Sequence, residues 1–224
     1  MWYRRVKLQQ FLLGIAIVSI IMAASVKVIR FIAISVEKPR ESVCRDNAFY
    51  IGFQLLDYRG THGNFLPTIL TDSTGRPMHS WRSVLFARID RNFAKRYNFA
   101  EPWNSPANQQ AAQTLQLVFG CPTYQDRPAK FANYAAIVTK DRSVSSLDAQ
   151  GFGRPGNGPR VLLIEVPNST IGWTEPRDVS PEEIRSLGFG HDPGGLSVVF
   201  ENGRVRRLPP EVINSLLQLP SARP

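Results

Sequence analysis

The chain has 224 residues, of which 43% are hydrophobic, and it carries a formal net charge of +9. This length is enough for one domain with its own core, whereas two cysteines are too few for a disulfide-rich scaffold and lack the C-x-x-C spacing of a zinc site. Residues 1–40 hold seven basic residues and one acidic residue, so most of the excess positive charge lies near the N-terminus. The rest of the chain is close to neutral, which argues against nucleic acid as a partner.

An uncharged stretch runs from Leu8 to Val26, directly after a basic N-terminus (Arg4, Arg5, Lys7). At about 1.5 Å per residue, a helix over this stretch nearly matches the roughly 30 Å hydrocarbon core of a bilayer. We therefore expect a single membrane span at about residues 8–26, within an N-terminal anchor of residues 1–40. A cleavable signal peptide is the alternative, with the small residues Ala23 to Ser25 as its cleavage region.

Basic residues lie on both sides of the uncharged stretch, so their count does not determine its orientation. Because a short basic N-terminus is hard to translocate, we expect a single-pass protein of the cell membrane whose N-terminus is cytoplasmic. Residues 41–224 then form an extracytoplasmic domain. In that compartment Cys44 and Cys121 either form one long-range disulfide or remain two buried thiols.

The first elements of the domain are predicted to be helical. Pro39 is expected to end or kink the anchor helix, because proline has no N–H to donate. A second helix is expected from about Ser42 to Gly60, with one apolar face that packs in the core (Cys44, Ala48, Ile51, Leu55, Tyr58).

Residues 68–78 are rich in turn-forming residues and are predicted to form a loop. From His79 to Tyr97, apolar residues recur every fourth position, which predicts an amphipathic helix with a basic outer side (Arg82, Arg88, Arg91, Lys95, Arg96). A weaker helix is predicted from Asn108 to Leu117, and residues 139–160 are predicted to form a loop.

The second half is predicted to contain mainly strands. Val161–Val166 is a short apolar strand, and residues 171–174 are a second candidate. Two further strands, at 196–200 and 205–208, flank Asn202-Gly203, the preferred pair for a two-residue hairpin turn in which both positions need positive φ. A terminal helix is expected from Glu211 to Leu219. Helices followed by a mainly antiparallel sheet define an α+β fold.

Several short motifs occur in a fixed order along nearly the whole chain. They are Cys44-x-x-Asn47, Ile51-Gly52, Tyr58…His62-Gly63-x-Phe65-x-Pro67, His79-Ser80-Trp81-Arg82, Glu101-Pro102-Trp103, Cys121-Pro122, Asn133-Tyr134, Leu162 to Val166, Trp173-Thr174-Glu175-Pro176 and His191-Asp192-Pro193-Gly194-Gly195…Asn202-Gly203. In this combination the chain resembles the planctomycete prepilin-like family of unknown function, which carries a C-terminal His-x9-Asp-Gly signature and is related to type II secretion pseudopilins.

The resemblance implies a type IV pilin-like fold, with a long N-terminal helix on an antiparallel sheet, and an envelope location among other envelope or secretion-system proteins. The family signature falls on seven residues here (His191, Gly194, Gly195, Asn202, Gly203, Trp173, Glu175). The chain departs from the family twice. Lys7 to Phe11 lack the glycine and glutamate of a prepilin peptidase site, and the terminal signature has Asn202 for aspartate with a spacing one residue longer. We therefore expect an anchor and not a processed pilus subunit.

Chemistry-bearing patterns are sparse. The three histidines (His62, His79, His191) include no i, i+4 pair, and no G-x-S-x-G elbow or P-loop is present. The G-x-G-x-x-G match at residues 151–156 contains Pro155 and precedes no expected helix. The segment from His191 to Gly195 is interpreted as a turn or as an ion-binding corner, with the turn favoured.

Two further groups of side chains could carry chemistry or binding. Glu165 and Glu175 are candidate paired carboxylates, but nothing in the sequence relates their positions. Three of the four tryptophans (Trp81, Trp103, Trp173) are interpreted as core residues, with a stacking surface as the alternative. We therefore predict no catalytic residue, no metal and no cofactor. The expected function is protein–protein contact by a non-enzymatic protein. An extracytoplasmic binding module for glycan or calcium is the alternative.

Overall fold

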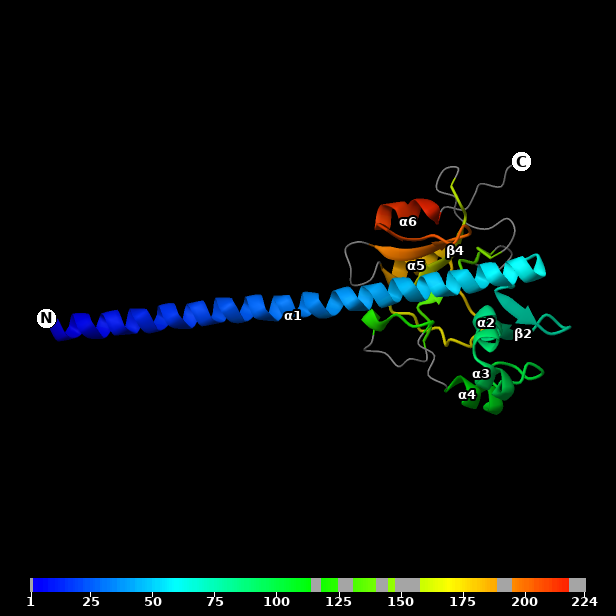
Figure 1. Cartoon of the computed structure of the whole chain (residues 1–224), viewed down its shortest axis with the longest axis horizontal. Coiled ribbons are helices and arrows are strands. Elements are labelled where there is room, and N and C mark those ends of the chain that lie inside the picture. Colours follow the sequence, from blue (N-terminus) through cyan, green and yellow to red (C-terminus); the bar gives the residue numbers. More distant parts are fainter. Residues whose placement is uncertain are drawn as a thin grey trace. The chain divides into compact units, whose positions relative to one another are not determined.

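The computed structural model describes residues 2–113, 118–124, 131–139, 145–147, 158–188 and 195–217. The chain divides into two units, residues 1–42 and residues 43–224. Helix α1 (Trp2–His62) supplies most of the first unit and continues into the second (Figure 1). The mixed α+β class predicted from the sequence is confirmed. Within the described residues, no helix has an apolar stretch long enough to cross a membrane.

Helix α1 is one continuous helix, so the prediction that Pro39 separates two helices is wrong. A proline removes only one hydrogen bond, at a cost of about 3 kcal/mol, and the bonds on either side carry the helix through. In the second unit, Cys44, Ala48, Ile51 and Leu55 are at most 1% exposed, which confirms the predicted apolar face. The helix ends before Gly63, which has a φ of +82° and donates its N–H to the carbonyl of Arg59 at 2.8 Å.

A small two-stranded sheet follows, formed by β1 (Ile69–Thr71) and β2 (Pro77–Ser80). The loop predicted over residues 68–78 is therefore partly strand, because the two segments pair antiparallel across the turn between them. This pairing also places His79 in a strand, where a helix was expected.

The single helix predicted up to Tyr97 is instead two helices, α2 (Trp81–Ile89) and α3 (Arg91–Arg96). Asp90 between them is extended, and its carboxylate accepts the backbone N–H groups of Asn92 at 2.7 Å and Phe93 at 2.9 Å. Aspartate at an N-cap satisfies donors that a helix start leaves free. This cap ends one helix and begins the next without interrupting the apolar face.

The main sheet is antiparallel in the order β3–β4–β5–β6. Its strands are β3 (Tyr134–Ala135), β4 (Val161–Glu165), β5 (Leu196–Phe200) and β6 (Val205–Leu208). The described residues of this unit also form the short helices α4 (Pro106–Ala112), η1 (Pro122–Tyr124), α5 (Pro181–Leu187) and α6 (Pro210–Leu216). The strand expected at residues 171–174 is a turn, because Glu175 donates its backbone N–H back to Gly172 at 2.9 Å. Some predicted segments lie partly outside the described residues. These are the end of the helix predicted to Leu117 (residues 114–117), most of the loop predicted over 139–160 (residues 140–144 and 148–157) and the end of the terminal helix after residue 217.

The β5–β6 hairpin is confirmed, but its turn differs from the expected one. Phe200 still donates its N–H to the carbonyl of Arg204 at 2.9 Å, so the loop closed by this bond has three residues, Glu201 to Gly203, and Gly203 has a φ of +78°. Asn202 keeps a negative φ and accepts the N–H of Arg204 at 3.1 Å through its side chain. A three-residue loop of this kind needs a left-handed residue only at its last position, which glycine supplies.

The sheet separates two hydrophobic clusters. On β3 and β5, adjacent residues alternate between them: Tyr134 and Val199 pack with α1 and α2 on one face, while Ala135 and Val198 pack with α5 and α6 on the other. Gly52 of α1 lies so close to β5 that an added Cβ would be 2.6 Å from the Val199 side chain. The helix therefore packs tightly on the middle of the sheet.

Candidate functional site

The C-terminal signature residues that the structure describes mainly determine the local backbone conformation. Gly195 has a φ of +96°, and a Cβ there would lie 1.7 Å from a carbonyl oxygen of β6, so only glycine fits. Asn202 and Gly203 form the hairpin turn. His191 and Gly194 lie outside the described residues.

Trp173 and Glu175 also have structural partners. Trp173 is 2% exposed, donates its indole N–H to the carbonyl of Ala112 at 3.0 Å and packs among phenylalanines. Trp81 is fully buried, so at least two of the tryptophans are core residues. Glu175 accepts the backbone N–H of Gly172 at 2.9 Å, in the turn that replaces the expected strand.

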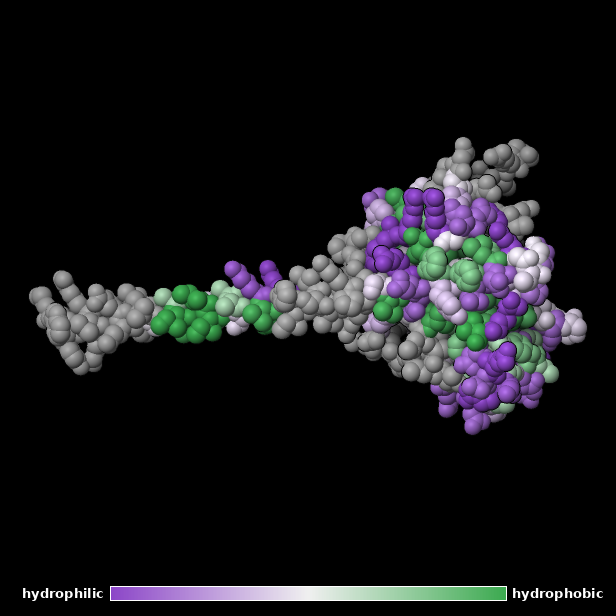
Figure 2. All heavy atoms as spheres, viewed as in Figure 1, coloured by the Kyte–Doolittle hydropathy of each residue, from purple (hydrophilic) through white to green (hydrophobic). Residues whose placement is uncertain are grey.

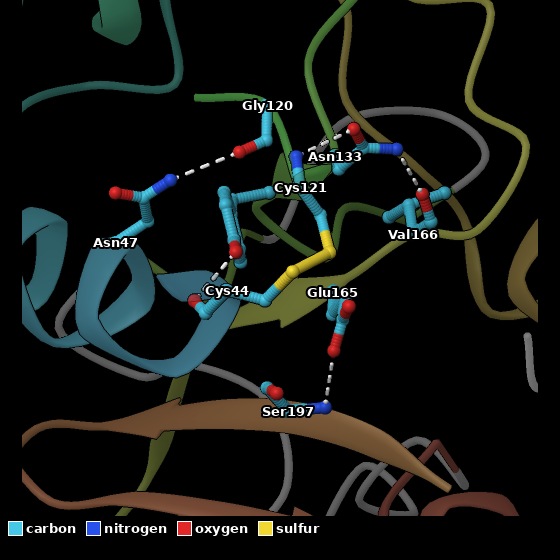
Figure 3. Close-up of a disulfide and its surroundings, with 9 residues drawn as sticks. Cys44, Asn47, Gly120, Cys121, Asn133, Glu165, Val166 and Ser197 are labelled. Atoms are coloured by element: carbon cyan, nitrogen blue, oxygen red, sulfur yellow. Dashed lines mark hydrogen bonds between the residues drawn. A yellow bond between two sulfur atoms is a disulfide. The ribbon is translucent and has the colours of Figure 1, made fainter. Parts of the chain in front are cut away.

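A disulfide joins Cys44 of α1 to Cys121, which directly precedes η1 (Figure 3). The two cysteines are 77 positions apart in sequence, their Cα atoms are 4.9 Å apart, and both are buried. Closing a loop of this length stabilises the folded chain by about 4.5 kcal/mol in the chain-entropy model. The sequence left this pairing open, because spacing alone does not show whether two cysteines meet.

Hydrogen bonds hold the chain on both sides of the disulfide (Figure 3). Asn47 donates its side-chain amide to the carbonyl of Gly120 at 3.0 Å. Asn133 accepts the N–H of Cys121 at 2.9 Å and donates to the carbonyl of Val166 at 3.0 Å. These bonds tie α1, residues 118–121 (the Cys121 segment) and the end of β4 together around the two sulfur atoms.

The hydroxyl of Tyr134 donates to the carbonyl of Cys44 at 2.6 Å, inside the same cluster. Burial raises the pKa of Tyr134 well above its usual value, and the nearby carboxyl group of Glu165 raises it further. The phenol therefore stays protonated and keeps donating to the helix over the physiological range of pH.

Glu165, at the end of β4, is the carboxylate of this site. It is 1% exposed, and its Oε2 accepts the N–H of Ser197 on β5 at 2.9 Å. Within the described structure its Oε1 has no hydrogen-bond partner. One carboxylate oxygen of Glu165 and the two cysteine sulfurs all lie within 4.8 Å of one another. Glu165 thus accepts a backbone N–H of β5 and lies beside the disulfide, whereas Glu175 accepts the backbone N–H of Gly172 in a turn.

A second buried polar cluster centres on Arg82 and Asp178, which the sequence did not indicate. Arg82 was predicted on the basic outer side of a helix, but its side chain is fully buried and contacts Asp178 at 2.6 Å. It also donates to the carbonyls of Tyr134 and Arg177, each at 3.2 Å. Burial raises the pKa of Asp178, while the guanidinium opposes that shift. The pair links α2 to β3 and to the segment before α5.

The two described histidines lie in different environments. His79 is 3% exposed, with Nε2 3.0 Å from the carbonyl of Phe99 and Nδ1 3.0 Å from the hydroxyl of Tyr97. A carbonyl only accepts, so Nε2 carries the proton and Nδ1 accepts from the tyrosine. Burial lowers the pKa of His79. His62 is exposed at the end of α1 and stacks on Tyr58, so these histidines form no common site.

Helix α1 also carries exposed apolar side chains within the second unit. Val43, Phe49, Tyr50 and Phe53 are 38–56% exposed. Helical spacing places them on the side of α1 opposite its buried face. A shallow groove of about 360 Å³ adjoins Phe49, lined also by Arg45 and by hairpin residues that include Arg204 and Arg206. We call Val43, Phe49, Tyr50 and Phe53 the outer face of α1.

Comparisons with protein-family models, with curated proteins and with solved structures found no match. A proposal about function therefore has to start from the structure, and two features of the described residues suggest one. One is the outer face of α1, which is apolar and exposed. The other is the buried cluster of Cys44, Cys121 and Glu165.

Proposed function

We propose that this protein is a non-enzymatic, membrane-anchored envelope protein of the pseudopilin-like type that acts through protein–protein contacts. Residues 1–40 are its anchor, with a span at about residues 8–26, a cytoplasmic N-terminus and an extracytoplasmic domain. The uncharged sequence from Leu8 to Val26 supports this assignment. So do the exposed apolar side chains that α1 carries from Ile15 to Ile29 (Figure 2).

The disulfide between Cys44 and Cys121 supports the extracytoplasmic placement of the domain. Disulfides form and persist in oxidising compartments and are rare in the cytoplasm of most cells. The expected envelope location agrees with this chemistry, since both cysteines belong to the part of the chain that follows the anchor.

The outer face of α1 is the observation that carries the proposal of protein contact. Three of its four side chains are aromatic, and aromatic residues are enriched at the centres of protein interfaces. Phe49 and Phe53 are each 56% exposed, which leaves large apolar areas in contact with water unless a partner covers them. Arg45, Arg204 and Arg206 beside Phe49 supply a charged border of the kind that interfaces have.

Photo-crosslinking in the native membrane tests this proposal. A benzophenone amino acid at Phe53 is expected to crosslink a second protein, whereas the same residue at the exposed Asn214 of α6 is the matched control. Membrane fractionation and protease protection of the same cells report the anchor and its sidedness. Equal crosslinking at the two positions, or recovery of the full-length chain in the soluble fraction, would contradict the proposal.

A further inference from the structure

The two disulfide sulfurs and the carboxylate of Glu165 together have the composition of a metal site. Two sulfurs and one carboxylate oxygen, all from buried residues, lie within 4.8 Å of one another (Figure 3). Thiolate and carboxylate are both common zinc ligands, at about 2.3 Å and 2.0–2.2 Å. Ligands around a tetrahedral ion at these distances are roughly 3.5–3.8 Å apart, so small side-chain rotations bring these three to the required spacing.

An independent observation at Glu165 also points to a ligand. Its Oε1 is buried and accepts no hydrogen bond within the described structure, although Oε2 does. A buried carboxylate oxygen without a donor costs free energy, and native structures rarely keep one without a compensating role. In Figure 3 the carboxylate of Glu165 lies between Ser197, which binds one oxygen, and the disulfide.

We propose that this cluster is a redox-gated cation site, in which the reduced chain binds one thiophilic divalent cation such as Zn²⁺ through Cys44, Cys121 and Glu165. In the oxidised chain the sulfurs are bonded to each other and the disulfide connects α1 to the Cys121 segment. In the reduced chain the cation takes over that connection. The inference does not depend on the proposed protein–protein contacts or on the membrane anchor.

The gating reaction is a thiol–disulfide exchange with a dithiol. One thiolate of the dithiol attacks a sulfur of the Cys44–Cys121 bond and forms a mixed disulfide, and the other cysteine leaves as a thiolate that takes up a proton. The second thiol of the reductant then closes its own disulfide and releases the remaining cysteine. Two electrons and two protons thus pass to the protein. Binding of the cation releases the two thiol protons again, because only the thiolate is a ligand.

Cobalt(II) titration of the full chain in a mild detergent tests the site. The chain is reduced with dithiothreitol, freed of the dithiol by gel filtration without oxygen, and titrated with Co²⁺. We expect one equivalent to produce a thiolate-to-cobalt charge-transfer band and the visible bands of tetrahedral Co²⁺, and Zn²⁺ to abolish both. The oxidised chain is expected to give neither band. Zn²⁺ is also expected to raise the melting temperature of the reduced chain but not that of the oxidised chain.

Variants separate a built site from two adjacent thiols. Cys44→Ser is expected to abolish tight binding, and Glu165→Gln to weaken it at least tenfold, since glutamine keeps the bond to Ser197 but not the charge. Glu175→Gln is the matched control, because Glu175 also accepts one backbone N–H, at 2.9 Å, but belongs to another turn. Its affinity should equal that of the unmodified chain.

Three outcomes would overturn the inference. They are no cobalt bands after reduction, equal affinity in Glu165→Gln and the unmodified chain, and unfolding of the reduced chain that Zn²⁺ does not reverse. Fluorescence of the buried Trp81 and Trp173 reports folding in every sample.

Discussion

Gly52 offers the sharpest test of how α1 packs on the sheet. A Cβ at this position would lie 2.6 Å from Cγ1 of Val199, whereas carbon atoms in contact are about 3.5–4.0 Å apart. Val199 is 1% exposed and β-branched, so it has few alternative rotamers to adopt. Gly52→Ala therefore forces α1 and β5 apart by about 1 Å or strains the valine.

The expected magnitude follows from two opposing effects. Overpacking a core by one methyl group costs about 1–3 kcal/mol, whereas alanine in a helix is more favourable than glycine by about 1 kcal/mol. Gly60 of the same helix has no atom within 4 Å of an added Cβ, so Gly60→Ala experiences only the helical gain. We expect the free energy of unfolding of Gly60→Ala to exceed that of Gly52→Ala by about 1–3 kcal/mol.

Denaturant unfolding of the full chain in detergent, followed by tryptophan fluorescence, measures this difference. Trp81 and Trp173 belong to the same hydrophobic cluster as Val199 and report its loss. The double variant of Gly52→Ala with Val199→Ala should lose less free energy of unfolding than the two single variants lose together, because the smaller side chain makes room for the new methyl group. Equal stability of Gly52→Ala and Gly60→Ala would refute the close packing of α1 on β5.

Three further predictions concern the buried polar groups. Replacing Cys44 and Cys121 together by alanine should lower the free energy of unfolding by about 4.5 kcal/mol, measured in denaturant without reductant; a loss under 1 kcal/mol would show that the loop is closed by other contacts. Because burial lowers the pKa of His79 in the folded state, the unfolded state binds more protons, so stability should fall as pH drops below about 6.5. His79→Gln should remove that part of the slope in pH-dependent melting, and an unchanged slope would contradict the assignment. Arg82→Met should lower the free energy of unfolding by about 3–5 kcal/mol, because it leaves the carboxylate of Asp178 buried without its cation. If this uncompensated charge is the cause, the double variant of Arg82→Met with Asp178→Asn should regain most of the lost stability in denaturant unfolding.

Local patterns were the part of the fold that could be predicted from the sequence. Apolar spacing predicted the buried face of α1, and Asn202-Gly203 predicted the β5–β6 hairpin. Helix boundaries were less predictable. Asp90 ends one helix by bonding the first N–H groups of the next, and α1 continues through Pro39. At Asp90 two hydrogen bonds from backbone N–H groups to one carboxylate set the boundary, whereas the one bond that Pro39 lacks was not enough to make a boundary there.

The site depended on contacts between distant segments. The residues around Glu165 in the sequence predict only a strand. They do not indicate that its carboxylate lies beside a disulfide, because Cys44 and Cys121 belong to segments far away in the chain. Arg82 had the spacing of a surface residue, yet Asp178 and backbone carbonyls compensate its charge in the core. Composition does not reveal such compensation, since it requires knowing which groups meet.

The sequence by itself therefore determined the α+β class, the apolar face of α1, the hairpin and the uncharged N-terminal stretch, because each depends on neighbours a few positions apart. Tertiary structure alone decided that Cys44 bonds Cys121, that Glu165 lies beside them and that Arg82 is buried. The physical reason is that a disulfide, an ion pair or a metal site is specified by distances of a few ångströms between atoms. Those distances exist only after the core has closed and brought α1, the Cys121 segment and β4 together.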